Sequence, residues 1–209
     1  MEYLDYALQN SWESLSNLES PIDIDLTLTT HKTLYKQPLA LTFASNKQII
    51  KKIQANGDQF LANGTLTIAD NKYELQRIHF HDGSEHTLKG QRLDGEIHFV
   101  YQNENGANLV LALLCQVNDQ RAERLALNQI YSEDAQINEL SKLLPDDLSH
   151  VTYTGSLTTP PLTADVTWVV LTTPHYISNS SKKALHNDYP ENHRETQPLN
   201  GREVIYYTK

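Results

Sequence analysis

Three histidines are spaced as the ligands of one metal ion could be. His79 and His81 are one residue apart in a run with the alternation of a β-strand, so their imidazoles share a face, about 6.6 Å apart along the backbone. The run Gly95-Glu96-Ile97-His98 begins the next predicted strand, and antiparallel pairing can bring His98 onto that face. Three neutral imidazoles leave one position of a tetrahedral zinc site open, as in catalytic zinc sites. We expect Zn²⁺ here, with water as its fourth ligand.

Spacing alone leaves this site open to other interpretations. A His-x-His pair also arises by chance among ordinary strand histidines. The run His79-x-His81-x-x-x-Glu85, followed by His98, is also similar to the metal motif of cupins, in which Glu85 would be a fourth ligand on a jelly roll. The two cupin motifs usually lie further apart, and this interpretation leaves the C-terminal third of the chain unexplained.

The elements that must position these residues are mainly strands. Alternating apolar residues, many of them β-branched or aromatic, predict strands at residues 65–68, 73–81, 96–101, 108–117, 166–171 and 204–207. Turn signals such as Asp94-Gly95 between them favour antiparallel hairpins. Ser132 is a predicted N-cap of one helix, whose apolar face ends before Pro145, and Ser178 begins a second helix that runs to about His186. The pattern predicts a mainly β (α+β) fold.

Composition limits the partners. The 209 residues suit a single domain, 1–209, and the formal charge of −9 disfavours nucleic acid and anionic membranes. The apolar run from Leu109 to Cys115 is too short to span a bilayer. The N-terminus carries acids where a secretory signal carries Lys or Arg, and Cys115 is the single cysteine. We therefore expect no signal peptide and a cytoplasmic protein.

Five ordered motifs indicate a family: Ser20-Pro21-Ile22-Asp23-Ile24, Phe80-His81-x-Gly83-Ser84-Glu85-His86, Tyr153-Thr154-Gly155-Ser156-Leu157-Thr158-Thr159-Pro160-Pro161, Val166-Thr167-Trp168, and Gln197-Pro198-Leu199-Asn200-Gly201-Arg202. With them, the chain from Trp12 to Tyr207 resembles the α-class carbonic anhydrases of bacterial type. The resemblance implies a large, mostly antiparallel, ten-stranded twisted sheet with a few short helices. It also implies a lyase that reversibly hydrates carbon dioxide to bicarbonate and a proton, with zinc-bound hydroxide as the nucleophile.

The resemblance assigns roles to individual residues. His79, His81 and His98 match the zinc ligands, Thr158 the threonine that accepts a hydrogen bond from the hydroxide, and Glu85 the carboxylate that accepts the threonine's proton. Glu96 matches the carboxylate that accepts the Nδ1 proton of His98, and this second partner fixes the ring's tautomer. Residues implied to line the pocket for carbon dioxide and bicarbonate are Val100, Leu111, Leu157, Thr159 and Trp168. His86 matches a position used for internal hydrogen bonding.

The chain also departs from the family pattern. Arg77 stands where the family usually has a glutamine that accepts a proton from the first zinc histidine, and an arginine side chain only donates. Residues 44–52 are expected to cover the position of the family's proton-shuttle histidine but contain none. Asp82 replaces an aromatic or small residue. The five histidines outside the motifs are expected at the surface: His31, His150, His175, His186 and His193.

Two further interpretations stay open on the sequence. A carbonic-anhydrase-like protein could bind zinc with little or no turnover, although members of that kind have typically lost a zinc histidine and this chain retains all three. Bacterial relatives are often dimers, so a homodimer is possible.

Overall fold

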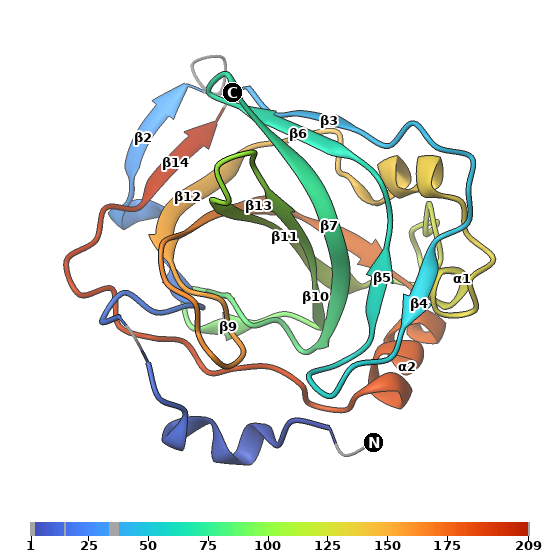
Figure 1. Ribbon diagram of the computed structural model, residues 1–209, viewed down its shortest axis with the longest axis horizontal. Helices are drawn as coiled ribbons and strands as arrows, with labels where there is room; N and C mark the ends of the chain where they lie inside the picture. Colours follow the sequence, from blue (N-terminus) through green and yellow to red (C-terminus); the bar gives the residue numbers. More distant parts are fainter. Residues whose placement is uncertain (1–2, 15, 34–37, 209) are drawn as a thin grey trace.

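The computed structural model describes residues 3–14, 16–33 and 38–208 and is dominated by one strongly twisted sheet (Figure 1). In the described residues this sheet has 11 strands, in the order β2-β14-β12-β13-β11-β10-β7-β5-β4, with β6 also beside β7 and β3 beside β6. The bounds are β2 (Thr30–Thr33), β3 (Ala40–Thr42), β4 (Ile50–Lys52), β5 (Gln59–Leu61), β6 (Thr65–Ile68), β7 (Asn71–Asp82), β10 (Gly95–Gln102), β11 (Asn108–Val117), β12 (His150–Gly155), β13 (Val166–Ile177) and β14 (Ile205–Thr208). A small sheet joins β1 (Asp23–Ile24), β8 (Thr87–Leu88) and β9 (Gln91–Arg92).

Most strand pairs are antiparallel, and within the large sheet β11 with β13 and β14 with β2 are parallel. The predicted mainly β fold, with a large sheet and a few short helices, is confirmed. The expected ten strands become eleven among the described residues. The predicted strands 65–68 and 108–117 have the observed bounds, whereas β13 continues six residues past the predicted end at Leu171.

The helices are short: η1 (Tyr6–Ser11), η2 (Leu26–Leu28) and η4 (Ile137–Leu143) are 3-10 helices, and α1 (Leu127–Tyr131) and α2 (Asn179–Asp188) are α-helices. Ser178 caps α2 as predicted, because its side chain accepts a hydrogen bond from the amide of Ser181. The prediction that Ser132 begins a helix is wrong, since Ser132 closes the C-terminus of α1. Ile137, Leu140 and Leu143 are spaced by three, which suits the three-residue turn of a 3-10 helix.

Apolar side chains cover both faces of the central strands, because residues of a strand alternate between faces. On one face, Ile97 and Phe99 of β10 and Leu111 of β11 belong to a core with residues of α1, η4 and α2. On the other face, Val100 and Val110 belong to a second core that contains Trp168 of β13. β10 and β11 are therefore buried on both sides and form a rigid base for the side chains that they carry.

Among the described residues, no helix is both long and apolar enough to span a membrane.

Candidate metal centre

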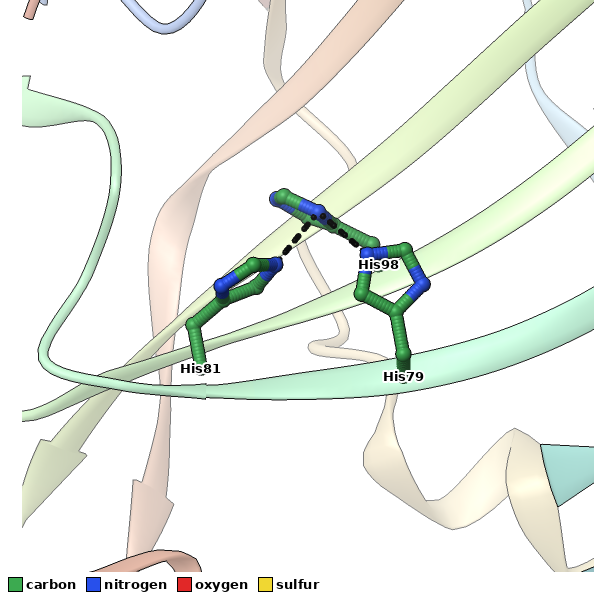
Figure 2. Close-up of side chains that lie close together, drawn as sticks. All are labelled: His79, His81 and His98. Atoms are coloured by element: carbon green, nitrogen blue, oxygen red, sulfur yellow. Dashed lines mark hydrogen bonds between the residues drawn. The ribbon is translucent and has the colours of Figure 1, made fainter. Parts of the chain in front are cut away.

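The three predicted ligands meet on one face of the large sheet (Figure 2). β7 carries His79 and His81, and β10 pairs with it antiparallel so that His98 lies directly opposite His79. The Nδ1 atom of His98 lies 3.1 Å from Nε2 of His81 and 3.2 Å from Nε2 of His79. The three side chains form a group whose ligand atoms all lie within 4.8 Å of one another.

The hydrogen-bond partners of two rings determine which nitrogens are free. Nδ1 of His81 donates to the carbonyl oxygen of Asn192 at 2.6 Å, and Nε2 of His98 donates to Oε1 of Glu96 at 2.8 Å. In neutral rings the lone pairs then lie on His81 Nε2 and His98 Nδ1, the two atoms that face each other at 3.1 Å. Two lone pairs at that distance repel unless a cation lies between them. Tetrahedral zinc with bonds of 2.0–2.1 Å would place its nitrogens about 3.3–3.4 Å apart, so the donor set fits this ion.

Burial favours the neutral form of His79 and His81, the form in which a histidine binds a metal. Burial lowers the pKa of His79 well below its ordinary value, and the neighbouring His98, His81 and Arg77 lower it further. Burial also lowers the pKa of His81, against the opposing effect of the Glu85 carboxylate. Protons therefore compete poorly with a metal for these nitrogens.

Glu96 links the centre to the second core. Oε1 accepts hydrogen bonds from His98 at 2.8 Å and from Nδ1 of His86 at 2.7 Å, and Oε2 accepts from the amides of Glu85 and His86. Burial raises the pKa of Glu96, but the rings of His86 and His98 outweigh it and hold the pKa well below its ordinary value. His86 continues the network through Nε2 to the hydroxyl of Tyr153 at 2.6 Å, which confirms its internal hydrogen-bonding role.

The predicted atom of the Glu96 contact is wrong: the carboxylate binds Nε2 of His98 and not Nδ1. Because His98 lies directly opposite His79, its Nδ1, the ring nitrogen nearer the backbone, faces the partner strand. The more distant Nε2 therefore reaches the carboxylate of Glu96, two residues away on the same strand.

The second partner of His81 comes from a segment that sequence analysis did not include. Asn192 lies 111 residues after His81 and offers a backbone carbonyl, which has no residue-type signal. Its side chain also binds β7, accepting from the amide of Asp82 at 2.7 Å and donating to the carbonyl of Phe80 at 2.9 Å. Asn192 therefore fixes the end of β7 at the same place where it orients a ligand.

Asp82 forms a second connection at this end of β7. Its carboxylate accepts hydrogen bonds from Lys182, from Nδ1 of His186 at 2.8 Å and from the amide of Glu191 at 3.0 Å. Lys182 and His186 belong to α2, so this acid joins α2 and the segment before Asn192 to the strand that carries two ligands. Where the family has an aromatic or small residue, this chain therefore has Asp82, which forms an ion pair with Lys182 of α2.

His79 differs from the other two ligands. Among the residues that the structure describes, none forms a hydrogen bond with its Nδ1, and Arg77 donates to no acceptor. Arg77 therefore does not supply the missing acceptor, as its chemistry predicts.

The expected hydrogen bond between Thr158 and Glu85 is not formed. Thr158 is buried, but Oε2 of Glu85 has no hydrogen-bond partner among residues 3–14, 16–33 and 38–208 and lies 3.5 Å from Nε2 of His81. Oε1 of Glu85 accepts from the amide of Arg194 at 2.8 Å, which turns the other oxygen toward the histidines. Glu85 is not among the groups that could coordinate with His79, and the large mixed sheet differs from the jelly roll of the cupin interpretation.

The apolar pocket residues are only partly brought together. Val100 and Trp168 belong to the second core, with Leu157 packed against it, and the ring of Trp168 lies 5.0 Å from that of His98. Leu111 is wrong, because it pairs with Phe99 and faces the opposite core. A shift of one residue moves a side chain to the other face of a strand, and Val110 is the residue on the Val100 face. Thr159 begins a turn, in which its carbonyl accepts a hydrogen bond from the amide of Leu162.

The segment 44–52 does not pair with β7. Its backbone contacts residues 135–138, and its strand β4 pairs with β5. β5 lies between this segment and β7, with Phe60 opposite Ile78. The assignment of residues 44–52 to the position of the shuttle histidine stays a prediction, and the strand between them and β7, β5 (Gln59–Leu61), also contains no histidine.

The remaining histidines fall into two groups. His31 and His186 are exposed, as expected. His193 is half-buried. His150 and His175 contradict the surface expectation: they are 0% and 6% exposed, and Nε2 of each has no hydrogen-bond partner in the part of the chain that the structure describes. His150 lies where β12 is paired with both β13 and β14, whereas His175 lies beyond the stretch of β13 that pairs with β12 and is opposite Cys115 of β11.

Comparisons with known proteins agree with this geometry. The sequence pattern of the family described as eukaryotic-type carbonic anhydrase matches residues 9–208. A carbonic anhydrase of Klebsiella pneumoniae is 35% identical over 219 residues, covering 95% of this chain and 85% of the relative. One of Neisseria gonorrhoeae is 32% identical over 206 residues, covering 90% of this chain and 76% of the relative.

Solved structures show the same fold. The α-carbonic anhydrase of Thermovibrio ammonificans, solved with the inhibitor sulfanilamide, superposes with a TM-score of 0.81 at 28% identity, covering 91% of this chain and 88% of the other. A carbonic anhydrase of Chlamydomonas reinhardtii, solved with acetazolamide, gives a TM-score of 0.83 at 26% identity, covering 99% and 98%.

Proposed function

This chain belongs to the eukaryotic-type, or α-class, carbonic anhydrases, enzymes that reversibly hydrate carbon dioxide, and we propose that it does so with Zn²⁺ held by His79, His81 and His98. The observation that carries the zinc assignment is the 3.1 Å approach of two ring nitrogens whose hydrogen bonds leave both with lone pairs.

In carbonic anhydrases, the type example of this chemistry, zinc lowers the pKa of bound water to about 7 and so supplies a nucleophile at neutral pH. The protein's own groups do the rest. Glu96 and the Asn192 carbonyl hold two rings in the required tautomer and orientation. Val100, Leu157 and Trp168 offer neutral carbon dioxide an apolar surface beside His98.

Thr158 and Glu85 complete the proposal as the acceptors that orient the attacking oxygen. Oε2 of Glu85 is buried and has no hydrogen-bond partner among the described residues, so it can accept a hydrogen bond from the Thr158 hydroxyl. The Thr158 hydroxyl would rotate toward it once the oxygen that Thr158 binds is present. Thr159 is proposed to contact bicarbonate from the adjoining turn.

The wider setting is also proposed. A cytoplasmic location agrees with a single cysteine, Cys115, which is fully buried and can form no internal disulfide. One domain over residues 1–209 and a homodimer complete this description. Fractionation of cells that express the native gene, and light scattering of the purified protein, test location and assembly.

The decisive experiment is stopped-flow measurement of carbon dioxide hydration on protein of known zinc content, beside His98→Ala and the exposed-site control His31→Ala. We expect the first variant to lose zinc and activity and the second to retain both. Equal hydration rates in His98→Ala and the parent would refute the site. Bound zinc without hydration would instead support the zinc-binding protein that does not turn over.

A further inference from the structure

Arg77 lies on the same face of the sheet as the candidate metal centre. It precedes His79 by two residues on β7, and strand alternation therefore directs both side chains to one side. Its partner across the sheet is Val100, which belongs to the core beside His98. The side chain is half-buried, and its positive charge lies within electrostatic reach of the His79 ring.

The guanidinium of Arg77 has no partner among the residues that the structure describes. Every other described arginine contacts a carboxylate, a backbone carbonyl or an aromatic ring: Arg92 with Glu195, Arg124 with Asp146, Arg194 with Glu19, Arg202 with the carbonyl of Thr154, and Arg121 over the ring of Tyr176. The half-buried side chain keeps some contact with solvent, and arginine stays charged, so its N–H donors face water without a counter-charge from the described residues. The unpaired donors of Arg77 therefore offer a site for an anion from solution.

We propose that Arg77 is a second anion-binding group of this centre and takes a planar, monovalent oxyanion through two parallel N–H donors. The fork of a guanidinium matches two oxygens of such an anion. The proposal rests on the proposed function, because bicarbonate is then the oxyanion that the reaction produces beside Arg77. Carbon dioxide is neutral and offers no charge to the guanidinium. Arg77 is thus a specificity-determining residue that favours retention of the charged product over the neutral substrate.

The test measures binding of nitrate, a planar oxyanion that is not turned over. Isothermal titration of sodium nitrate into the zinc-loaded enzyme, at constant ionic strength, is compared with Arg77→Gln and Arg77→Lys. We expect Arg77→Gln to weaken nitrate binding about tenfold, as the loss of a charge-assisted pair of hydrogen bonds requires. Arg77→Lys keeps the charge but lacks the fork, so an intermediate loss is expected.

Arg121→Gln is the matched control, because it removes the same charge from a site where the guanidinium stacks on Tyr176. It is expected to bind nitrate like the parent protein. The inference is overturned if folded Arg77→Gln, checked by circular dichroism, binds nitrate within twofold of the parent. It is also overturned if Arg121→Gln loses as much affinity, since the effect would then come from net charge.

Zinc content and carbon dioxide hydration of the same samples test the proposed function separately. If the parent does not hydrate carbon dioxide but Arg77→Gln binds nitrate more weakly than the parent, the anion site is supported and the proposed function is not. An active enzyme whose nitrate affinity is the same in the parent and in Arg77→Gln would support the proposed function and exclude the anion site.

Discussion

The three histidines differ in what holds their second nitrogen. His98 has a buried carboxylate, His81 has a backbone carbonyl, and His79 has no partner among the described residues. A hydrogen bond to the second nitrogen fixes the tautomer and raises the basicity of a ligand. His98 is therefore the best oriented of the three, and Glu96 is the residue whose alteration should weaken metal binding most directly.

Replacing Glu96 with glutamine should lower zinc affinity about 10–100-fold. The amide keeps the size of the side chain, but its NH₂ group would face one of the four donors that now bind the carboxylate. Competition with a chelating dye measures zinc affinity. Glu74→Gln is the control, because that side chain is 64% exposed and forms an exposed ion pair with Lys72. An unchanged zinc affinity in Glu96→Gln would show that this carboxylate does not orient the ligand.

Sequence identified the ligands because alternation on two paired strands places them on one face whatever the details of the fold. It misplaced Leu111 because the register between β10 and β11 is set by pairing across the hairpin, and one residue of error reverses the face. It also named the wrong nitrogen of His98, because the ring's orientation depends on which strand lies opposite. The sequence therefore predicted which residues form the site, but not the face of the strand that Leu111 occupies or the orientation of the His98 ring.

At the scale of elements, the segment from Glu191 to Arg194 supports the centre from outside the sheet. It supplies the carbonyl for His81, two side-chain bonds to β7, and the amide of Arg194 for Glu85. This segment has neither the period of a strand nor that of a helix, so no sequence pattern predicts its position. α2, by contrast, was predictable from its Ser178 cap, and it holds the adjacent Asp82 through Lys182.

Asn192→Ala should destabilise the protein by about 2–3 kcal/mol, because it leaves the amide of Asp82 and the carbonyl of Phe80 without partners in a buried place. Zinc affinity should also fall, since the carbonyl that binds His81 loses its support. Urea unfolding and chelator competition measure the two effects. Asn138→Ala, which removes an exposed contact with Asn46, should change either quantity little. A stable Asn192→Ala variant with full zinc affinity would contradict the supporting role.

Turnover should be limited by proton export. On the edge of β7 away from β10, the strand paired beside His79 is β5, and its residues Gln59, Phe60 and Leu61 have no side chain that titrates near neutral pH. At low buffer concentration, the hydration rate should therefore rise severalfold as imidazole is added at constant pH and ionic strength. A rate that is high and independent of buffer would mean that another group carries the proton.

At the scale of the whole molecule, the large sheet buries polar side chains, including two histidines, as well as apolar ones. β12 and β13 also carry the buried rings of His150 and His175, and Nε2 of each has no hydrogen-bond partner among the described residues. Period and composition could not predict this, because β12 mixes threonine, histidine and tyrosine instead of alternating apolar with polar residues. Such histidines are neutral in the folded state and gain a proton readily when the chain unfolds.

His175 should therefore make the protein less stable in mild acid. Burial, with a smaller contribution from Arg124, lowers its pKa to about 4 against the attraction of Glu123, whereas an unfolded histidine titrates near 6.5. The unfolded state binds more protons between these values, so this contribution to stability falls as pH drops from 6.5 toward 4. At pH 5 the loss is about 2 kcal/mol relative to pH 7.5.

His175→Gln cannot be protonated, so its free energy of unfolding should fall about 2 kcal/mol less than that of the parent between pH 7.5 and pH 5. Urea unfolding at both pH values measures this difference. His31→Gln is the control, because it makes the same substitution at an exposed site. The metal-binding histidines contribute equally to parent and variants, so their protonation cancels in the comparison. Equal pH dependence in His175→Gln and the parent would show that this ring is protonated in the folded protein as easily as in the unfolded chain.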